Sequence, residues 1–191
     1  VNLLLGSLPI KDGNNLYNRS IAIDVNGEVI SYYDKIHMFD VTLRNNETYK
    51  ESDTYTPGNH LKTFKIDNIK IGHSICYDLR FPKLYRALAK KGSQIIVIPS
   101  AFTYTTGKAH WNTLVRSRAI ENGVYIVAPN QWGINNEKRS TFGHSMVVDP
   151  WGNILAEAKD KETILNCEID INKVDDCQNS IPVLKHDIDL Y

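Results

Sequence analysis

The stretch "IKIGHSICYDLRFPKLYRALAKKGSQIIVIPS", residues 69–100, predicts a strand, a helix and a second strand in succession. The apolar run before Cys76 is typical of a strand, and Pro82 suits the first turn of a helix. Cys76 would therefore lie where the strand ends, with its sulfur exposed and backbone N–H groups beside it, as nucleophiles are commonly presented. The alternative is a buried cysteine that acts as a small hydrophobe.

The same alternation continues downstream of this unit. Residues 109–122 predict a helix that Gly123 ends, and residues 124–130 predict a third strand. Strands that are apolar on both faces and alternate with helices indicate a sheet covered by helices. The sequence from 69 to 130 therefore predicts a β-α-β-α-β arrangement.

The flanking segments predict antiparallel structure. Asn26-Gly27 and Asp67-Asn68 are hairpin signals, because these residue types tolerate positive φ, and they centre hairpins over 20–35 and 62–76. Residues 2–9 predict a short buried strand, and residues 39–59 predict a long polar loop of the kind that is often functional. The last predicted strands, in a meander, are the segments 144–158 and 162–170.

Composition narrows the class of protein. The chain has 191 residues, 42% hydrophobic and 23% charged, which fits a single domain over 1–191. Its 22 basic and 22 acidic residues give zero formal net charge, so no nucleic-acid partner is expected. No apolar run is long enough to span a bilayer, and three cysteines without a C-x-x-C pair argue against disulfides and zinc. A cytoplasmic protein with no membrane contact is expected.

A catalytic cysteine needs help to become a thiolate, since its free pKa is about 8.5. His73 is a poor helper, because on a strand of period two it faces away from a residue three positions later. Spacing alone does not select among the other residues that could help to deprotonate the cysteine. Lys35 shares a predicted strand face with Tyr33, although it could equally snorkel to the surface. The histidines that spacing does not exclude are His37, His110 and His144.

Seven blocks, in the same order, resemble the nitrilase superfamily of carbon-nitrogen hydrolases, most closely its Nit amidase branch. They are "YYDKIHMFD", "YKES", "SICYDLRFP", "PSAFTYTTGKAHW", "RSRAIENGVYIVAPNQWG", "GHSMVVDPWG" and the closing "IPVL…DLY". The block "SAFTYTTGKAHW" is similar to amidases that hydrolyse deaminated glutathione. The resemblance implies an α+β fold, a four-layer α-β-β-α sandwich.

The resemblance also implies a set of catalytic residues. It puts the nucleophile on Cys76, the catalytic lysine on Lys35 and an auxiliary glutamate on Glu51. The Tyr77 N–H and the Lys35 ammonium would hold the oxyanion, at about 3 kcal/mol for each donor. Lys35 would also depress the thiol pKa. Attack on an amide would release ammonia and leave a thioester for water to hydrolyse, with no metal or organic cofactor.

Substrate recognition is implied in the same way. Arg80 would bind a substrate carboxylate with its planar fork, although a structural salt bridge is the alternative. Phe102 would supply an apolar wall and Thr106 a hydroxyl. The expected substrate is a small carboxylated amide of the deaminated-glutathione type. An ω-amidase on 2-oxo dicarboxylic monoamides, an N-carbamoyl amidohydrolase and a non-catalytic scaffold are the alternatives.

One catalytic part of the family pattern has no match. Members of the superfamily take their general-base glutamate from a segment upstream of the lysine hairpin. The only glutamate before Lys35 is Glu28, which follows the Asn26-Gly27 turn and should face solvent. The expectation is a chain that lacks its N-terminal unit and exposes a strand edge. Such an edge favours a homodimer or a higher homo-oligomer.

Overall fold

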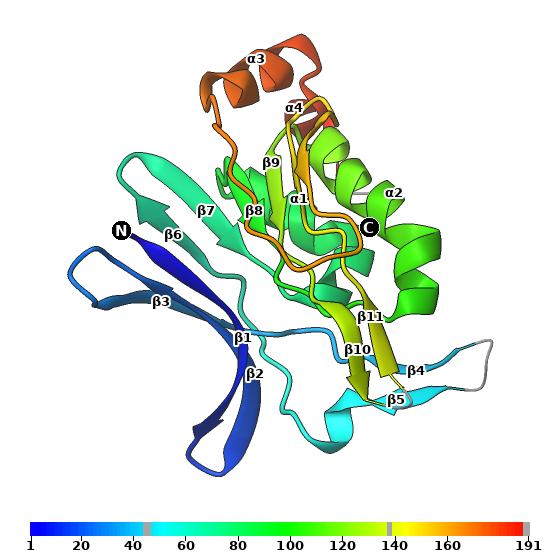
Figure 1. The fold of residues 1–191 in the computed structure, drawn as a ribbon. Helices are drawn as coiled ribbons and strands as arrows, with labels where there is room; N and C mark the ends of the chain where they lie inside the picture. The colour runs from blue at the N-terminus through cyan, green and yellow to red at the C-terminus, as the bar shows by residue number, and fades with distance from the viewer. Residues whose placement is uncertain (44–46, 137–138, 189–191) are drawn as a thin grey trace.

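The computed structural model describes residues 1–43, 47–136 and 139–188, and its centre is a mixed six-stranded sheet (Figure 1). The strands of this sheet are β6 (Thr63–Ile66), β7 (Ile69–His73), β8 (Ile95–Val97), β9 (Tyr125–Ala128), β12 (Met146–Val148) and β13 (Ile154–Glu157). They lie in the order β13-β12-β9-β8-β7-β6, with β7, β8 and β9 parallel and the others antiparallel to their neighbours. Two parts of the predictions, 44–46 in the long loop and 189–191 in the closing block, lie outside the described residues.

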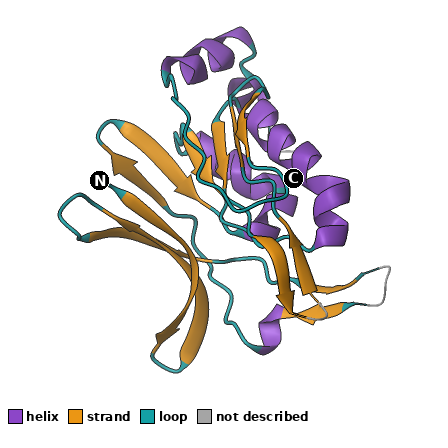
Figure 2. Ribbon diagram, in the orientation of Figure 1, coloured by secondary structure: helices purple, strands orange, loops and turns teal. Residues whose placement is uncertain are grey.

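Two helices connect the parallel strands, and both pack on one face of the sheet (Figure 2). They are α1 (Pro82–Lys90) and α2 (Tyr104–Asn122). The β-α-β-α-β prediction for this region is confirmed. α2 begins earlier than the predicted Ala109, because the hydroxyl of Thr103 accepts a hydrogen bond from the Thr106 N–H and caps the helix. Gly123 ends it with φ 60°, as predicted.

A second sheet contains β1 (Leu3–Asp12), β2 (Asn15–Ile23) and β3 (Val29–Asp34), in that order. The hairpin predicted at Asn26-Gly27 is confirmed, with Gly27 at φ 87°. The second predicted hairpin is also confirmed, since β6 pairs with β7 across Asp67. β2 packs on the sheet face opposite the helices, where Ala22 joins Phe64 and other buried side chains of the large sheet.

The prediction that residues 2–9 form a buried strand is wrong in its burial. β1 is a strand, but among the described strands it pairs only with β2 and forms an edge of its sheet. Its side chains are exposed or half-buried, with Leu3 50% and Leu8 40% exposed. An apolar run does not reveal whether a second layer covers it, because burial depends on the tertiary neighbours.

Two short hairpins were not predicted. The segment 39–59, predicted as a loop, contains β4 (Asp40–Thr42), β5 (Thr48–Lys50) and the 3₁₀ helix η1 (Glu51–Asp53). A second hairpin contains β10 (Trp132–Asn136) and β11 (Arg139–Phe142). Each strand has three to five residues, too few for a period of two to stand out in the sequence.

The C-terminal region confirms one predicted strand pair and corrects another prediction. β12 and β13 pair as expected for 144–158. Residues 162–170 are not a strand, and the chain there runs without regular structure into α3 (Asn172–Ser180) and α4 (Val183–His186). The apolar Ile164 is 86% exposed, and Ile169 packs against the large sheet without forming a strand of it.

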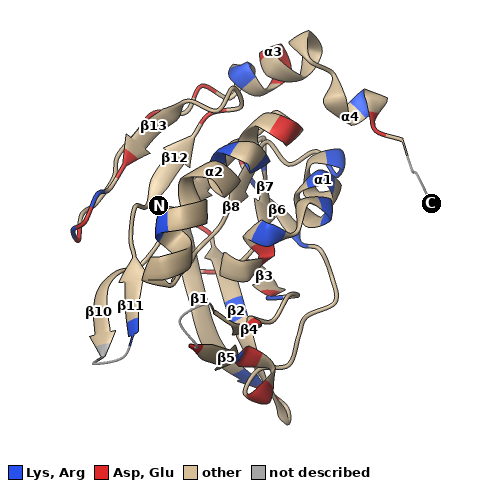
Figure 3. Ribbon diagram, turned by 90° about the vertical axis from the view of Figure 1, so that its right-hand side faces the viewer, with Lys and Arg blue, Asp and Glu red and all other residues tan. Residues whose placement is uncertain are grey.

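The architecture is α+β. The pair α1 and α2, the six-stranded sheet and the β1–β3 sheet form successive layers that match the expected α-β-β-α order up to its third layer. Basic and acidic residues are mixed along the elements, in line with the zero formal net charge (Figure 3). No helix in the described part of the chain is long and apolar enough to cross a membrane. That residues 1–191 form one domain stays a prediction.

Candidate active site

Cys76 lies at a strained bend between β7 and the 3₁₀ helix η2 (Cys76–Arg80). Its φ is 48°, in the left-handed region that a residue with a Cβ rarely adopts. The bend is held in place because the Cys76 N–H donates to the Pro99 carbonyl at 3.0 Å. Such backbone strain costs of order 1–3 kcal/mol and concentrates at functional sites. The predicted elbow is therefore present.

The buried carboxylate of Asp78 joins this bend to the segment that carries Lys35. Its Oδ2 accepts hydrogen bonds from the Tyr33 hydroxyl at 2.7 Å and from the Ile75 N–H at 2.9 Å. Its Oδ1 lies 2.7 Å from Nδ1 of His37 and accepts the His37 N–H at 3.1 Å. One side chain thus fixes the end of β3 relative to the cysteine.

Lys35 is buried and paired, so it does not snorkel to the surface. It is 2% exposed, and its Nζ donates to Glu51 Oε2 at 2.5 Å. The same Oε2 accepts the Phe39 N–H at 2.7 Å, and Oε1 accepts Asn18 Nδ2 at 3.0 Å. Three donors therefore hold the Glu51 carboxylate. Glu51 in turn holds the ammonium, which accounts for a lysine at a buried position.

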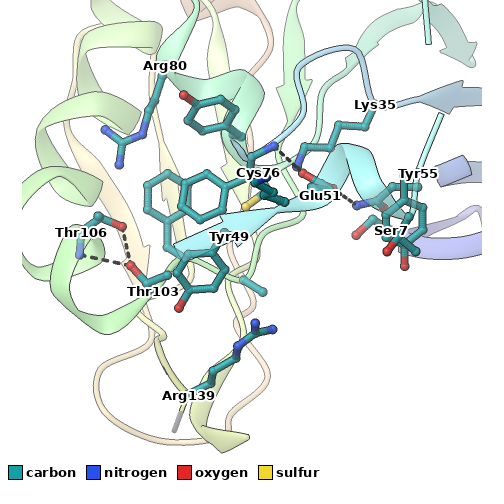
Figure 4. A pocket seen from close by; sticks show the side chains of 17 residues that line it. Ser7, Lys35, Tyr49, Glu51, Tyr55, Cys76, Arg80, Thr103, Thr106 and Arg139 are labelled. Carbon is teal, nitrogen blue, oxygen red and sulfur yellow. Dashed lines mark hydrogen bonds and ion pairs between the residues drawn. The ribbon is translucent and has the colours of Figure 1, made fainter. Parts of the chain in front are cut away.

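A cavity of about 410 Å³ brings together every residue that the sequence predicted for the site (Figure 4). Cys76, Lys35 and Glu51 lie on it together with the predicted binding residues Tyr77, Arg80, Phe102 and Thr106. Lys35 directly follows β3, Glu51 begins η1, and Cys76, Tyr77 and Arg80 belong to η2. Phe102 precedes α2, and Thr106 lies in its first turn. Their placement agrees with the predicted roles, which themselves stay predictions.

The predicted binding residues form one wall of the cavity. Phe102 is 4% exposed, and its N–H donates to Asn130 Oδ1 at 3.0 Å. The Arg80 guanidinium carbon lies 5.3 Å from the centre of the Phe102 ring, and Arg80 Nη1 lies 3.2 Å from His110 Nδ1. The Thr106 hydroxyl lies 2.8 Å from that of Thr103. Arg80 forms no salt bridge with a carboxylate in the described parts of the chain, and its partial burial lowers its pKa.

Lys35 lowers the pKa of the Cys76 thiol, as expected, but it does not set the direction of the net shift. Burial raises the pKa of Cys76. Lys35 and hydrogen bonding from the Ala101 backbone lower it, as expected of a nearby cation, while Glu51 raises it again. Burial outweighs the lysine, and the carboxylate of Asp78 raises the pKa as well. A base must therefore take the proton before or during attack.

None of the histidines that the structure describes lines the cavity. His73 is fully buried on β7 and is not on the cavity, in line with the expectation that it faces away from Cys76. His37 pairs with Asp78 and stacks on Phe81 with ring centres 3.6 Å apart. His144 pairs with Glu157 at 2.9 Å. The histidine alternatives therefore place no imidazole on the cavity beside the sulfur.

Sequence reasoning missed several residues of the cavity. Asn18, Tyr49, Lys50 and Arg139 line it as well. Asn18 lies just before the predicted hairpin over 20–35, so the sequence assigned it neither a face nor a partner. The others belong to the two short hairpins that the sequence did not predict. No local pattern marks a residue that reaches a site through a long-range contact.

Comparison with known proteins agrees with this geometry. Residues 1–179 match the carbon-nitrogen hydrolase family. The chain belongs to this family. It is 40% identical over 195 residues to a "Deaminated glutathione amidase" of Synechocystis sp., which covers 97% of this chain and 70% of that relative. It is 40% identical over 192 residues to "Omega-amidase NIT2" of Mus musculus, covering 100% of this chain and 70% of that relative.

A solved structure is similar over nearly the whole chain. The NitFhit protein of C. elegans superposes with a TM-score of 0.92 at 40% identity, covering 98% of this chain and 46% of that one. The chain thus spans less than half of that protein and 70% of the two amidases. The resemblance to the Nit branch of the nitrilase superfamily is confirmed, and the comparisons support hydrolytic amidase chemistry.

Proposed function

We propose that this carbon-nitrogen hydrolase cleaves the amide bond of a small carboxylated amide through a cysteine thioester. One observation carries the proposal. Cys76 stands at a strained bend on the same cavity as the Lys35–Glu51 pair. A positioned nucleophile beside a buried cation is the arrangement that acyl transfer needs.

The chemistry follows from this placement. Cys76 Sγ attacks the amide carbonyl, and a base takes the thiol proton. The oxyanion is held by the Lys35 ammonium and by the Tyr77 N–H, which lies in the first turn of η2, where backbone donors lack intrahelical acceptors. The carbon–nitrogen bond breaks, the amine leaves with a proton, and an acyl thioester remains. Water then adds to the thioester, which releases the acid and restores the thiol.

Arg80 supports an acyl group that ends in a carboxylate. Its guanidinium lines the cavity beside Phe102 and has no carboxylate partner in the described parts of the chain. We propose the deaminated-glutathione type of amide as the substrate. The close alternative is an ω-amidase that acts on 2-oxo dicarboxylic monoamides, which the equally similar mouse relative favours. We also propose a homodimer or higher oligomer. In addition we propose a cytoplasmic location, since the three cysteines are free.

The nucleophile is tested by acyl transfer from the mono-4-nitrophenyl ester of glutaric acid. Its leaving group needs no proton, so acylation does not depend on a general acid. Intact mass spectrometry should show one glutaryl adduct that Cys76→Ala abolishes. Cys167→Ala, which removes an exposed cysteine, should keep the adduct. An adduct that survives Cys76→Ala, or no adduct in the unaltered chain, would contradict the proposal.

The substrate is tested by comparing two amides on the same protein, the 191 residues joined to an upstream unit of a family member that supplies the general base. The release of cysteinylglycine from deaminated glutathione and of ammonia from 2-oxoglutaramate gives two values of kcat/KM. Both amides would use the same base, so their ratio does not depend on how well that base is supplied. We expect the ratio to favour deaminated glutathione by about tenfold, the equivalent of one charge-assisted contact. A ratio that favours 2-oxoglutaramate would make the protein an ω-amidase.

A further inference from the structure

The cavity is strongly basic although the chain as a whole is neutral. Four basic side chains line it, Lys35, Lys50, Arg80 and Arg139, whereas Glu51 is the one acidic side chain among its described lining residues. Glu51 is already paired with Lys35. Three cationic groups are therefore left to face a ligand, which is more positive charge than a single carboxylate requires.

Two of these groups are guanidinium forks on opposite sides of the sulfur. Figure 4 shows Arg80 on one side of Cys76 and Arg139 on the other. Each lies near an aromatic ring, which limits how it moves. The Arg80 carbon is 5.3 Å from the Phe102 ring centre, and the Arg139 carbon is 4.9 Å from that of Tyr49. A guanidinium placed on a ring keeps its donors free for a carboxylate.

The guanidinium of Arg139 has donors available for a ligand. Within the described ranges it forms no salt bridge with a carboxylate. The hydroxyl of its ring partner Tyr49 donates instead to Glu47 at 2.8 Å, so Tyr49 contributes its ring face and not a competing acceptor. Arg139 enters the cavity from β11 and Tyr49 from β5, the two short hairpins that border the cavity.

We propose that Arg139, supported by the Tyr49 ring, is a second anion subsite that binds a carboxylate on the leaving amine. The inference rests on the proposed function. The scissile carbonyl must sit at Cys76, so the acyl chain and the amine extend to opposite sides of the sulfur. With the acyl carboxylate at Arg80, the amine lies towards Arg139. The preferred substrate is an N-acyl amino acid or peptide with a carboxylate at each end, and the released amine is itself an amino acid or peptide.

Equilibrium binding tests the subsite without turnover. The Cys76→Ala protein is titrated calorimetrically with N-glutarylglycine and with N-glutarylglycinamide, which differ only in the charge on the amine side. We expect N-glutarylglycine to bind at least about tenfold more tightly, as one additional charge-assisted hydrogen bond would allow. Adding Arg139→Gln should remove this preference and leave the affinity for the glycinamide within about twofold. Arg139→Lys should restore part of it, since the charge returns without the fork.

The matched control is Lys108→Gln, which removes one exposed cation of α2 that does not line the cavity. It should change neither affinity. Equal loss of both ligands in Arg139→Gln, or no preference for N-glutarylglycine in the parent, would overturn the subsite. The proposed function fails separately: if the activated ester does not acylate Cys76 in the unaltered chain while Arg139 still sets the preference, the subsite stands without that chemistry.

Discussion

At the scale of single residues, His73 shows how burial sets a charge state. It is fully buried on β7, its ring centre lies 4.7 Å from that of Phe64, and neither ring nitrogen has a hydrogen-bond partner in the described structure. Burial lowers the pKa of His73 to about 4 from 6.5. Between pH 6.5 and 4, His73 therefore binds a proton in the unfolded chain but stays neutral in the folded chain. The stability contribution is complete above pH 6.5 and is lost as the pH falls from 6.5 to 4.

His73→Leu should therefore flatten the acid side of the stability profile. The pKa shift corresponds to about 3 kcal/mol at the low-pH limit. Urea unfolding at pH 7.5, 6.0 and 5.0 measures the free energy of unfolding, and the difference between variant and parent should move in favour of the variant as the pH falls. His60→Leu, at an exposed histidine, is the control and should keep the parent's slope. A parallel profile for His73→Leu would contradict the neutral buried ring.

At the scale of elements, the packing of α2 on the β10–β11 hairpin positions one border of the cavity. Gly107 of α2 lies so close to this hairpin that a Cβ would stand 2.2 Å from the Phe142 Cβ. Gly107→Ala should therefore push β11 away and destabilise the fold by about 1–3 kcal/mol, which lowers Tm by roughly 2–4 °C per kcal/mol. Thr105→Ala, two residues earlier at an exposed helix position, should change Tm little.

Calorimetric measurement of Tm in Gly107→Ala and Thr105→Ala tests whether the contact between α2 and the hairpin stabilises the fold. Because Arg139 begins β11, Gly107→Ala should also weaken the binding of N-glutarylglycine to the Cys76→Ala protein. An unchanged Tm in Gly107→Ala would show that the helix and the hairpin can separate without cost. In that case the contact with α2 would not fix the position of Arg139.

At the scale of the whole molecule, we expect the supply of a general base to limit the reaction. In the described structure Glu51 is the sole carboxylate on the cavity, and three donors engage it. Glu28 is exposed beyond its turn, as expected. General bases contribute about 10²–10⁴-fold. We therefore expect the 191 residues alone to release negligible ammonia from 2-oxoglutaramate.

Joining these residues to the upstream unit of a family member, with its glutamate, should restore turnover. The same fusion with that glutamate changed to glutamine is the control and should stay inactive. The fusion should also cover the β1 edge, where Leu3 and Leu8 are exposed. Light scattering should then show less self-association for the fusion than for the 191 residues alone. Turnover by the short chain that equals the fusion would mean that Glu51 serves as the base.

The sequence by itself determined what local patterns encode. Periods of two and 3.6, together with Pro82, Gly123 and the Asn26-Gly27 turn, predicted the β-α-β-α-β unit and the bend at Cys76. Local signals also predicted the hairpins over 20–35 and 62–76. These signals suffice because neighbouring residues set backbone preference. The roles assigned to Lys35 and Glu51 came from the resemblance, since spacing alone left the lysine, the histidines and the surface as alternatives.

Only the tertiary structure decided how distant residues meet. Tyr33 and Asp78 are 45 positions apart and bond at 2.7 Å, and Asn18 reaches Glu51 over 33 positions. Burial is equally non-local: it raised the pKa of Cys76 against the effect of Lys35, and it left β1 exposed although its sequence is apolar. Arg139 joined the cavity in the same way, through a hairpin too short to leave a pattern. Such contacts and desolvation depend on which surfaces face each other, and that is settled only when the sheets pack.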